Sequence, residues 1–173
     1  MEEQKALVAI IMGSDSDLAV MTKAVKVLED FEVPYKIDII SAHRTPEMAK
    51  DFSVNAHKEG IKVIICGAGL AAHLAGSVSA HTPLPVIGVP IGGGKLQGVD
   101  SLYSTVQMPP GVPVATVGID GAKNAALLAI QILGVSDKKY MDAILDFKKA
   151  QTKTIVEKSE KLKRLGYKKY LEG

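Results

Sequence analysis

The chain has 173 residues, of which 47% are hydrophobic, and its formal net charge is only +2. This length suits one domain with a sizeable core, and the small charge argues against a nucleic-acid-binding protein. No uninterrupted apolar run approaches the roughly 20 residues that a membrane helix needs, and residues 1–5 lack the apolar stretch of a signal peptide. A single cysteine, Cys66, favours a reducing compartment. We therefore expect a cytoplasmic protein.

Strand and helix patterns alternate five times along the first 135 residues. Apolar runs and strand-forming residues predict strands at 7–12, 35–40, 62–66, 85–89 and 112–117. Helical spacing and helix-forming composition predict helices that begin near 18, 46, 71, 98 and 122. This alternation predicts a three-layer α/β/α domain with a parallel sheet between the helices.

The strand order decides which loops meet. For five strands we favour the flavodoxin-like order 2-1-3-4-5, which makes strands 2, 1 and 3 neighbours. The loops after these strands, residues 41–46, 13–17 and 67–69, would then converge at the switch point where ligands bind in open α/β sheets. Topology alone therefore predicts a site built from these three loops.

The pattern changes at residue 136. Residues 1–135 hold 10 Lys and Arg against 13 Asp and Glu, whereas residues 136–173 hold 11 against 6. Because the basic residues alternate with acids, they indicate a solvated helical face. We expect one long helix followed by a further amphipathic piece around Leu162 and Leu165. This extension, 136–173, would pack on the catalytic domain, 1–135, or on a neighbouring subunit.

The turn at 41–46 joins a strand to a helix and carries three groups suited to chemistry. Thr45 is a candidate N-cap and Pro46 suits the first helical position. Between strand and helix lie the Ser41 hydroxyl, the His43 imidazole and the Arg44 guanidinium. Arginine matches phosphate geometry, and histidine transfers protons near neutral pH. The turn is therefore suited to holding an anion beside a proton-transfer group.

The loop at 13–17, Gly-Ser-Asp-Ser-Asp, precedes a helix. Its N–H groups and the hydroxyls of Ser14 and Ser16 could receive a phosphate at a helix N-terminus. Asp17 repels phosphate but can accept hydrogen bonds from a ribose diol. An ordinary capping sequence explains the same residues equally well.

Two glycine-rich segments resemble nucleotide motifs without matching them. Residues 67–72 fit G-x-G-x-x-A, but no acidic residue lies between Glu59 and Asp100, where a dinucleotide site needs one. The glycines there more simply let a smaller ligand approach the backbone. Residues 92–95, Gly-Gly-Gly-Lys, lack the first glycine and the final Ser or Thr of a P-loop. They form a mobile lid over the site or a plain flexible loop.

The other reactive residues give weaker indications. His73 could face the site or be structural, whereas His57 and His81 lie toward helix ends. The histidines lack the spacing of a metal site, so we expect no metal. Cys66 is expected to fill the core.

Five collinear blocks between about residues 6 and 150 resemble the PurE family. They are residues 12–17 (MGSDSD), 41–46 (SAHRTP), 67–76 (GAGLAAHLAG), 98–109 (GVDSLYSTVQMP) and 122–126 (AKNAA). The resemblance implies an enzyme of purine biosynthesis that moves a carboxyl group from the exocyclic nitrogen of an imidazole ribonucleotide to carbon 4. It implies no metal or organic cofactor, a small-molecule ribonucleotide as substrate, and a homo-octamer with active sites at subunit contacts.

The same resemblance implies roles for particular residues. His43 would be the general acid and base, and His73 would line the site. Ser14, Asp17 and Arg44 would bind the ribosyl phosphate, and the residues nearby would be Ser16, Ser41, Ala68 and Gly69.

Other functions stay open at this point. A sister branch of the family carboxylates aminoimidazole ribonucleotide directly with carbon dioxide, usually with Lys in place of Arg44 and without the 67–76 block. A related carboxylase could act on another nucleotide. A flavodoxin-like module could bind a nucleotide or flavin without catalysis, although His43 and Arg44 argue against a passive module.

Overall fold

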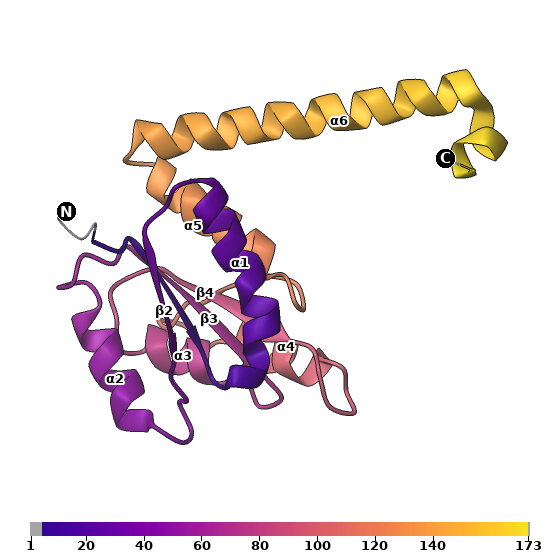
Figure 1. Cartoon of the computed structure of the whole chain (residues 1–173). Coiled ribbons are helices and arrows are strands. Elements are labelled where there is room, and N and C mark those ends of the chain that lie inside the picture. Colours follow the sequence, from indigo (N-terminus) through magenta and orange to yellow (C-terminus); the bar gives the residue numbers. More distant parts are fainter. Residues whose placement is uncertain (1–4, 173) are drawn as a thin grey trace.

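The computed structural model describes residues 5–172, so residues 1–4, considered above for a leader sequence, lie outside it. A five-stranded sheet forms the middle layer, with the order β2-β1-β3-β4-β5 and every pair parallel (Figure 1). The strands are β1 (Val8–Met12), β2 (Tyr35–Ile39), β3 (Val63–Gly69), β4 (Val86–Ile91) and β5 (Ala115–Thr116). The predicted flavodoxin-like order is confirmed.

Helices cover both faces of this sheet. On one face α1 (Leu18–Asp30) and α5 (Ala122–Gly134) share a buried cluster with alternate strand residues such as Ile10 and Ile65. On the other face α2 (Pro46–Asn55) and α3 (Leu74–Ser79) pack with Ile11 and Ile64. Because successive strand residues point to opposite faces and both faces are covered, the central strands read as continuous apolar runs.

Three predicted elements differ most from the structure in their boundaries. Residues 67–69, predicted as a loop, are the last residues of β3, where Gly69 pairs with Ile91 of β4. Small residues permit this extension, because a Cβ on Gly69 would already lie 3.4 Å from the Ile91 carbonyl oxygen. The helix expected from 71 begins at Leu74. The fifth strand has only two residues, 115 and 116, instead of 112–117, since it lies at the sheet edge and follows Pro113, which has no N–H to donate.

The C-terminal extension, α6 (Lys138–Leu171), consists of a long helix and a short final one, which meet at a kink at Gly166. Its first turns pack on the domain, where Tyr140 and Ile144 join the α1–α5 cluster and Phe147 meets Phe31 edge to face, with ring centroids 5.6 Å apart. Beyond that the helix projects away from the sheet with exposed side chains (Figure 1). The extension therefore begins on its own domain and leaves most of its length without an intramolecular partner.

The remaining helix, α4 (Val99–Val106), lies over β4 on the α3 side. Its buried Ser101 and Thr105 bond to nearby carbonyl oxygens, including Thr105 Oγ1 to Ser101 O at 2.7 Å. Among residues 5–172, none of the helices combines the length and the hydropathy that a membrane span requires.

Gly88 of β4 tests how closely α4 approaches the sheet. A Cβ at this position would lie 2.4 Å from Thr105 Cγ2 and 3.0 Å from Val114 Cγ1. We expect Gly88→Ala to lower the free energy of unfolding by about 1–3 kcal/mol through overpacking, measured by urea denaturation. Gly118→Ala, where a Cβ meets nothing within 4 Å, should change it by less than about 0.5 kcal/mol. Equal effects of the two substitutions would contradict the close packing of α4 on β4.

Candidate active site

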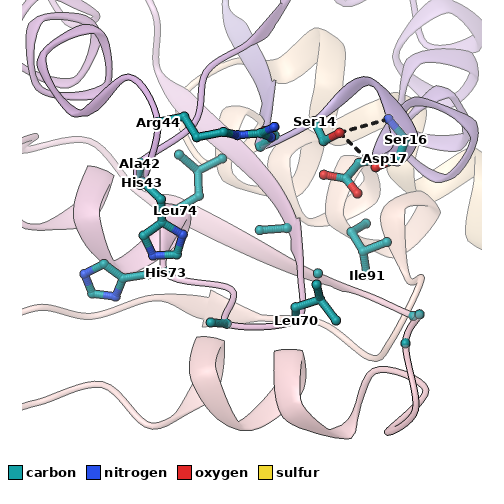
Figure 2. Close-up of a pocket in the computed structure, with 17 residues that line it drawn as sticks. Ser14, Ser16, Asp17, Ala42, His43, Arg44, Leu70, His73, Leu74 and Ile91 are labelled. Atoms are coloured by element: carbon teal, nitrogen blue, oxygen red, sulfur yellow. Dashed lines mark hydrogen bonds between the residues drawn. The ribbon is translucent and has the colours of Figure 1, made fainter.

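A cleft of about 780 Å³ opens at the carboxyl edge of the sheet, within the range of about 300–1,000 Å³ found for small-molecule sites. The ends of β3 and β4 and the loops that follow β1 and β2 form its wall, and Figure 2 shows the lining side chains. The lining residues are Gly13, Ser14, Ser16, Asp17, Ala42, His43, Arg44, Ala68, Gly69, Leu70, Ala71, His73, Leu74, Ile91, Gly92, Gly93 and Gly94. The three segments predicted to converge, residues 13–17, 41–46 and 67–69, all contribute to the lining, although 67–69 end strand β3, and the loop after β4 joins them.

The loop after β1 both caps a helix and lines the cleft. Residues 15–17 form the short 3₁₀ helix η1, and the Ser14 hydroxyl oxygen accepts from the Ser16 N–H at 3.3 Å. The Ser16 hydroxyl in turn donates to Ser14 Oγ at 2.9 Å. Capping and ligand binding were alternative interpretations of these residues. The structure shows that Ser14 caps the 3₁₀ helix, and Ser14 and Ser16 also line the cleft.

Asp17 is an acidic side chain that is only 7% exposed. Burial raises the pKa of its carboxyl, and the hydrogen bonds from Ser14 and Ser16 and the charge of Arg44 oppose this rise without cancelling it. The folded chain therefore holds a partly desolvated carboxyl group next to the Ser14 and Ser16 hydroxyls. Such a group is suited to accept hydrogen bonds from a bound ligand's hydroxyl groups.

The turn after β2 is closed by its own side chains. Thr45 Oγ1 lies 3.0 Å from both the N–H and the carbonyl oxygen of Ser41, accepting from the first and donating to the second. Thr45 occupies the N-cap position of α2 and Pro46 starts the helix, as predicted, but the Thr45 side chain makes no capping bond to the helix. Its hydroxyl is already used in fixing the turn that presents His43 and Arg44.

Arg44 joins the loops after β1 and β2. Its Nη2 donates to the Gly13 carbonyl oxygen at 2.8 Å, and Ser41 Oγ accepts from the Arg44 backbone N–H at 3.2 Å and from Nε at 3.4 Å. Arg44 lines the cleft, whereas Ser41, predicted as a binding residue, is absent from the lining. Ser41 instead fixes the position of Arg44, because its hydroxyl oxygen accepts hydrogen bonds from the Arg44 backbone and side chain.

The two candidate catalytic histidines come together. His43 follows β2 and His73 precedes α3, yet their rings are nearly parallel, with an interplanar angle of 10° and centroids 6.4 Å apart (Figure 2). Both line the cleft. His57 and His81 are exposed and lie outside the cleft lining, as expected. His73 therefore faces the cleft together with His43, and its role in the chemistry stays a prediction.

Sequence reasoning missed the apolar part of the lining. Leu70, Leu74 and Ile91 border the cleft, and nothing in their sequence pattern distinguishes them from core residues. Leu70 has a left-handed backbone, with φ +54°. For a non-glycine residue this conformation costs roughly 1–2 kcal/mol. Cys66 is buried in the core as expected, and burial raises the pKa of its thiol, which disfavours the reactive thiolate.

Taken together, the fold and the cleft define a flavodoxin-like α/β protein with a polar ligand site at the topological switch point. Among residues 5–172, no three His, Cys, Asp or Glu side chains are grouped as metal ligands would be. The model of the AIR carboxylase family matches residues 7–154. The chain therefore belongs to this family, which is the PurE family that the sequence blocks resemble.

Individual relatives carry two different names. An N5-carboxyaminoimidazole ribonucleotide mutase of Pyrococcus horikoshii is 54% identical and matches over 99% of this chain and 97% of its own. A phosphoribosylaminoimidazole carboxylase of Candida glabrata is also 54% identical over 99% of this chain, but the match spans only 30% of that longer protein. The crystal structure of Treponema denticola PurE2-S38D superposes with a TM-score of 0.85 at 32% identity, covering 92% of this chain and 99% of that one.

The buried carboxyl of Asp17 should make stability depend on pH. Because its pKa is raised in the fold, its contribution to stability is fully present below the unfolded value, near 3.8, and is lost as pH rises through the folded value. Asp17→Asn removes the buried charge, so we expect a higher urea midpoint than that of the original chain at pH 7. The difference should shrink below pH 3.8. Asp15→Asn, at an exposed neighbour, is the control, and an equal gain from it would contradict the burial argument.

Proposed function

We propose that the chain is an N5-carboxyaminoimidazole ribonucleotide mutase of purine (IMP) biosynthesis. It would convert 5-carboxyamino-1-(5-phosphoribosyl)imidazole to 5-amino-1-(5-phosphoribosyl)imidazole-4-carboxylate. The observation that carries this proposal is the pairing of His43 and His73 beside Arg44 in one cleft. Full-length relatives of the mutase name support the same reaction. A cytoplasmic location is part of the proposal.

The cleft offers matching groups for each part of such a ribonucleotide. Arg44 presents charged N–H donors suited to a phosphate, and Ser14 and Ser16 add hydroxyls at the adjoining loop. Asp17 would accept hydrogen bonds from the substrate. Ala68 and Gly69 have minimal side chains, so the imidazole and its carboxyl group can approach the end of β3 closely.

The reaction itself needs proton transfers at two atoms. As the carboxyl group leaves the exocyclic nitrogen, the C–N bond breaks, its electron pair stays on nitrogen, and a proton is delivered there. Carbon 4 then attacks carbon dioxide, and the ring loses the proton that carbon 4 carried. One imidazole can donate the first proton and accept the second, which suits His43 as general acid and base. His73, whose ring centroid lies 6.4 Å from that of His43, would position His43 or relay its proton.

The direct carboxylase is the second candidate function. It is favoured by fungal relatives that bear that name at 54% and 56% identity, although the chain spans only 30% of each. The two reactions differ in their substrates. The mutase acts on the N-carboxylated ribonucleotide without added bicarbonate, whereas the carboxylase needs aminoimidazole ribonucleotide and carbon dioxide. Supplying each substrate with and without bicarbonate and following the carbon-carboxylated product decides between them.

Replacing His43 tests the assignment of the proton carrier. We expect His43→Asn to fold and bind the product while its turnover falls by about 10²–10⁴-fold. Turnover is measured by formation of the carboxylated product, and binding by calorimetry with that product. His73→Asn is the matched variant and should lose less activity if it only positions His43. Full activity of His43→Asn would exclude it as general acid and base.

We also propose that the chain forms a homo-oligomer, with eight copies as the family resemblance implies. Two surfaces support this. The edge strand β2 exposes Ile37 and Ile39 at 40% and 47%, and the projecting part of α6 exposes Ile155 and Leu162. Burying such apolar side chains against a second copy is favourable.

The projecting helix should be required for assembly. Ile155 and Leu162 are seven residues apart and share one helix face, so the double change Ile155→Glu and Leu162→Glu should yield smaller assemblies than the original chain. Native mass spectrometry measures the copy number. Lys153→Glu, on a different helix face, is the control and should leave the assembly intact. A monomeric original chain would contradict the proposed oligomer, and an unchanged double variant would exclude this face as an interface.

A further inference from the structure

Gly76 lies inside helix α3, where glycine is an unfavourable residue. A glycine within a helix is destabilising relative to alanine, because it loses more conformational freedom on folding. An alanine would be crowded here, since a Cβ on Gly76 would lie 3.1 Å from both Sδ and Cε of Met108. The missing side chain therefore leaves a notch in α3, and the Met108 thioether occupies this notch.

The imidazole of His73 borders the same notch. Residues three apart share one helix face, and the Cβ position on Gly76 that faces Met108 also lies 3.7 Å from His73 Cε1. Methionine sulfur packs favourably at the edge of an aromatic ring. The His73 ring thus has two side-chain neighbours, Met108 beside its Cε1 edge and the nearly parallel ring of His43.

Hydrogen bonds do not fix the orientation of the His73 ring. Among residues 5–172, the one hydrogen bond to a histidine ring is at His81, whose Nδ1 lies 2.8 Å from the Ser77 carbonyl oxygen. The His73 side chain is exposed at the cleft. An exposed ring without such a bond keeps one rotamer only where neighbouring side chains pack against it. Met108 is placed to provide that packing.

The segment that carries Met108 is itself held in place. It continues into a turn in which the Val112 N–H donates to the Pro109 carbonyl oxygen at 3.2 Å. Directly after this turn, the Ser79 hydroxyl donates to the Pro113 carbonyl oxygen at 2.7 Å, which ties the segment to the end of α3. The thioether is therefore presented to α3 by a segment with two fixed points.

We infer that Met108 is a positioning residue that holds the His73 imidazole beside His43. This inference rests on the proposed function, in which His73 assists the proton carrier. Met108 lies outside the cleft lining, so it acts through His73 and not on the substrate. Without the thioether, the His73 ring turns away from His43, while the groups that bind the ribonucleotide stay in place. The sequence block at 98–109 thereby gains a part in the site.

Met108→Ala tests this role. Met108 is only partly buried, so the variant should fold, and we expect its kcat to fall several-fold with KM unchanged. Met108→Leu conserves the volume and should keep most of the turnover. The decisive variant joins Met108→Ala to His73→Asn. Its turnover should equal that of His73→Asn alone, because a residue that acts through His73 has no effect once the imidazole is gone.

NMR tests the position of the ring without any turnover. In protein labelled with ¹³C-histidine, the Cε1–H resonance of His73 is identified by its absence from His73→Asn, and it should shift in Met108→Ala. Met21→Ala is the matched control, because Met21 occupies a similar notch at Gly67 on the opposite face of the sheet. It should leave the resonance in place, and its effect on turnover should multiply with that of His73→Asn.

Four results would overturn the inference while the mutase function stands: unchanged turnover of Met108→Ala, losses that multiply when it is combined with His73→Asn, a resonance that does not move, or an equal shift in Met21→Ala. An original chain that does not convert the N-carboxylated ribonucleotide would instead overturn the proposed function. The resonance would then still decide whether Met108 positions the His73 ring.

Discussion

The arrangement of the site depends on one constraint, the parallel pairing of β1 with β2 on one side and β3 on the other. Parallel strands place all their carboxyl ends at one edge, and the reversal of strand order at β1 opens a crevice there. The segments at these three carboxyl ends are far apart in the sequence, and the strand pairing brings them together. Hydrogen bonds then fix them to one another, above all the bond from Arg44 Nη2 to the Gly13 carbonyl oxygen. The position of the cleft thus follows from sheet topology before any side chain is considered.

Several features of this edge lower the stability of the folded chain. Asp17 is an acidic group largely removed from water, and burial raises the pKa of its carboxyl. Leu70 has a conformation that leucine adopts at a cost. The interior offsets these costs, because β1 and most of β3 and β4 are buried on both faces. Stability in the layers and strain at the edge are therefore separated in space, as is common where a fold serves a ligand site.

The C-terminal helix divides into two physically different parts. The segment near Tyr140 and Ile144 completes the core over α1 and α5, whereas the part beyond it presents both charged and apolar side chains to solvent. The first part is therefore packed into the core of the domain. Most stability of a helix in a protein comes from tertiary contacts of an apolar face, so the second part is suited to a partner surface.

The sequence by itself determined the layered fold, the strand order and the three loops of the site, because buried strands and amphipathic helices leave periodic patterns and parallel connections have few allowed topologies. Motifs also predicted Arg44 as an anion-binding group and His43 as a proton-transfer group, and both line the cleft. Only the tertiary structure decided that His73 stacks on His43, that Ser41 lies behind Arg44, and that the Thr45 hydroxyl closes its own turn. It alone placed Leu70 and Ile91 at the cleft and ended β3 at Gly69. The reason is that these features depend on side-chain direction and on contacts between distant segments, which local pattern does not specify.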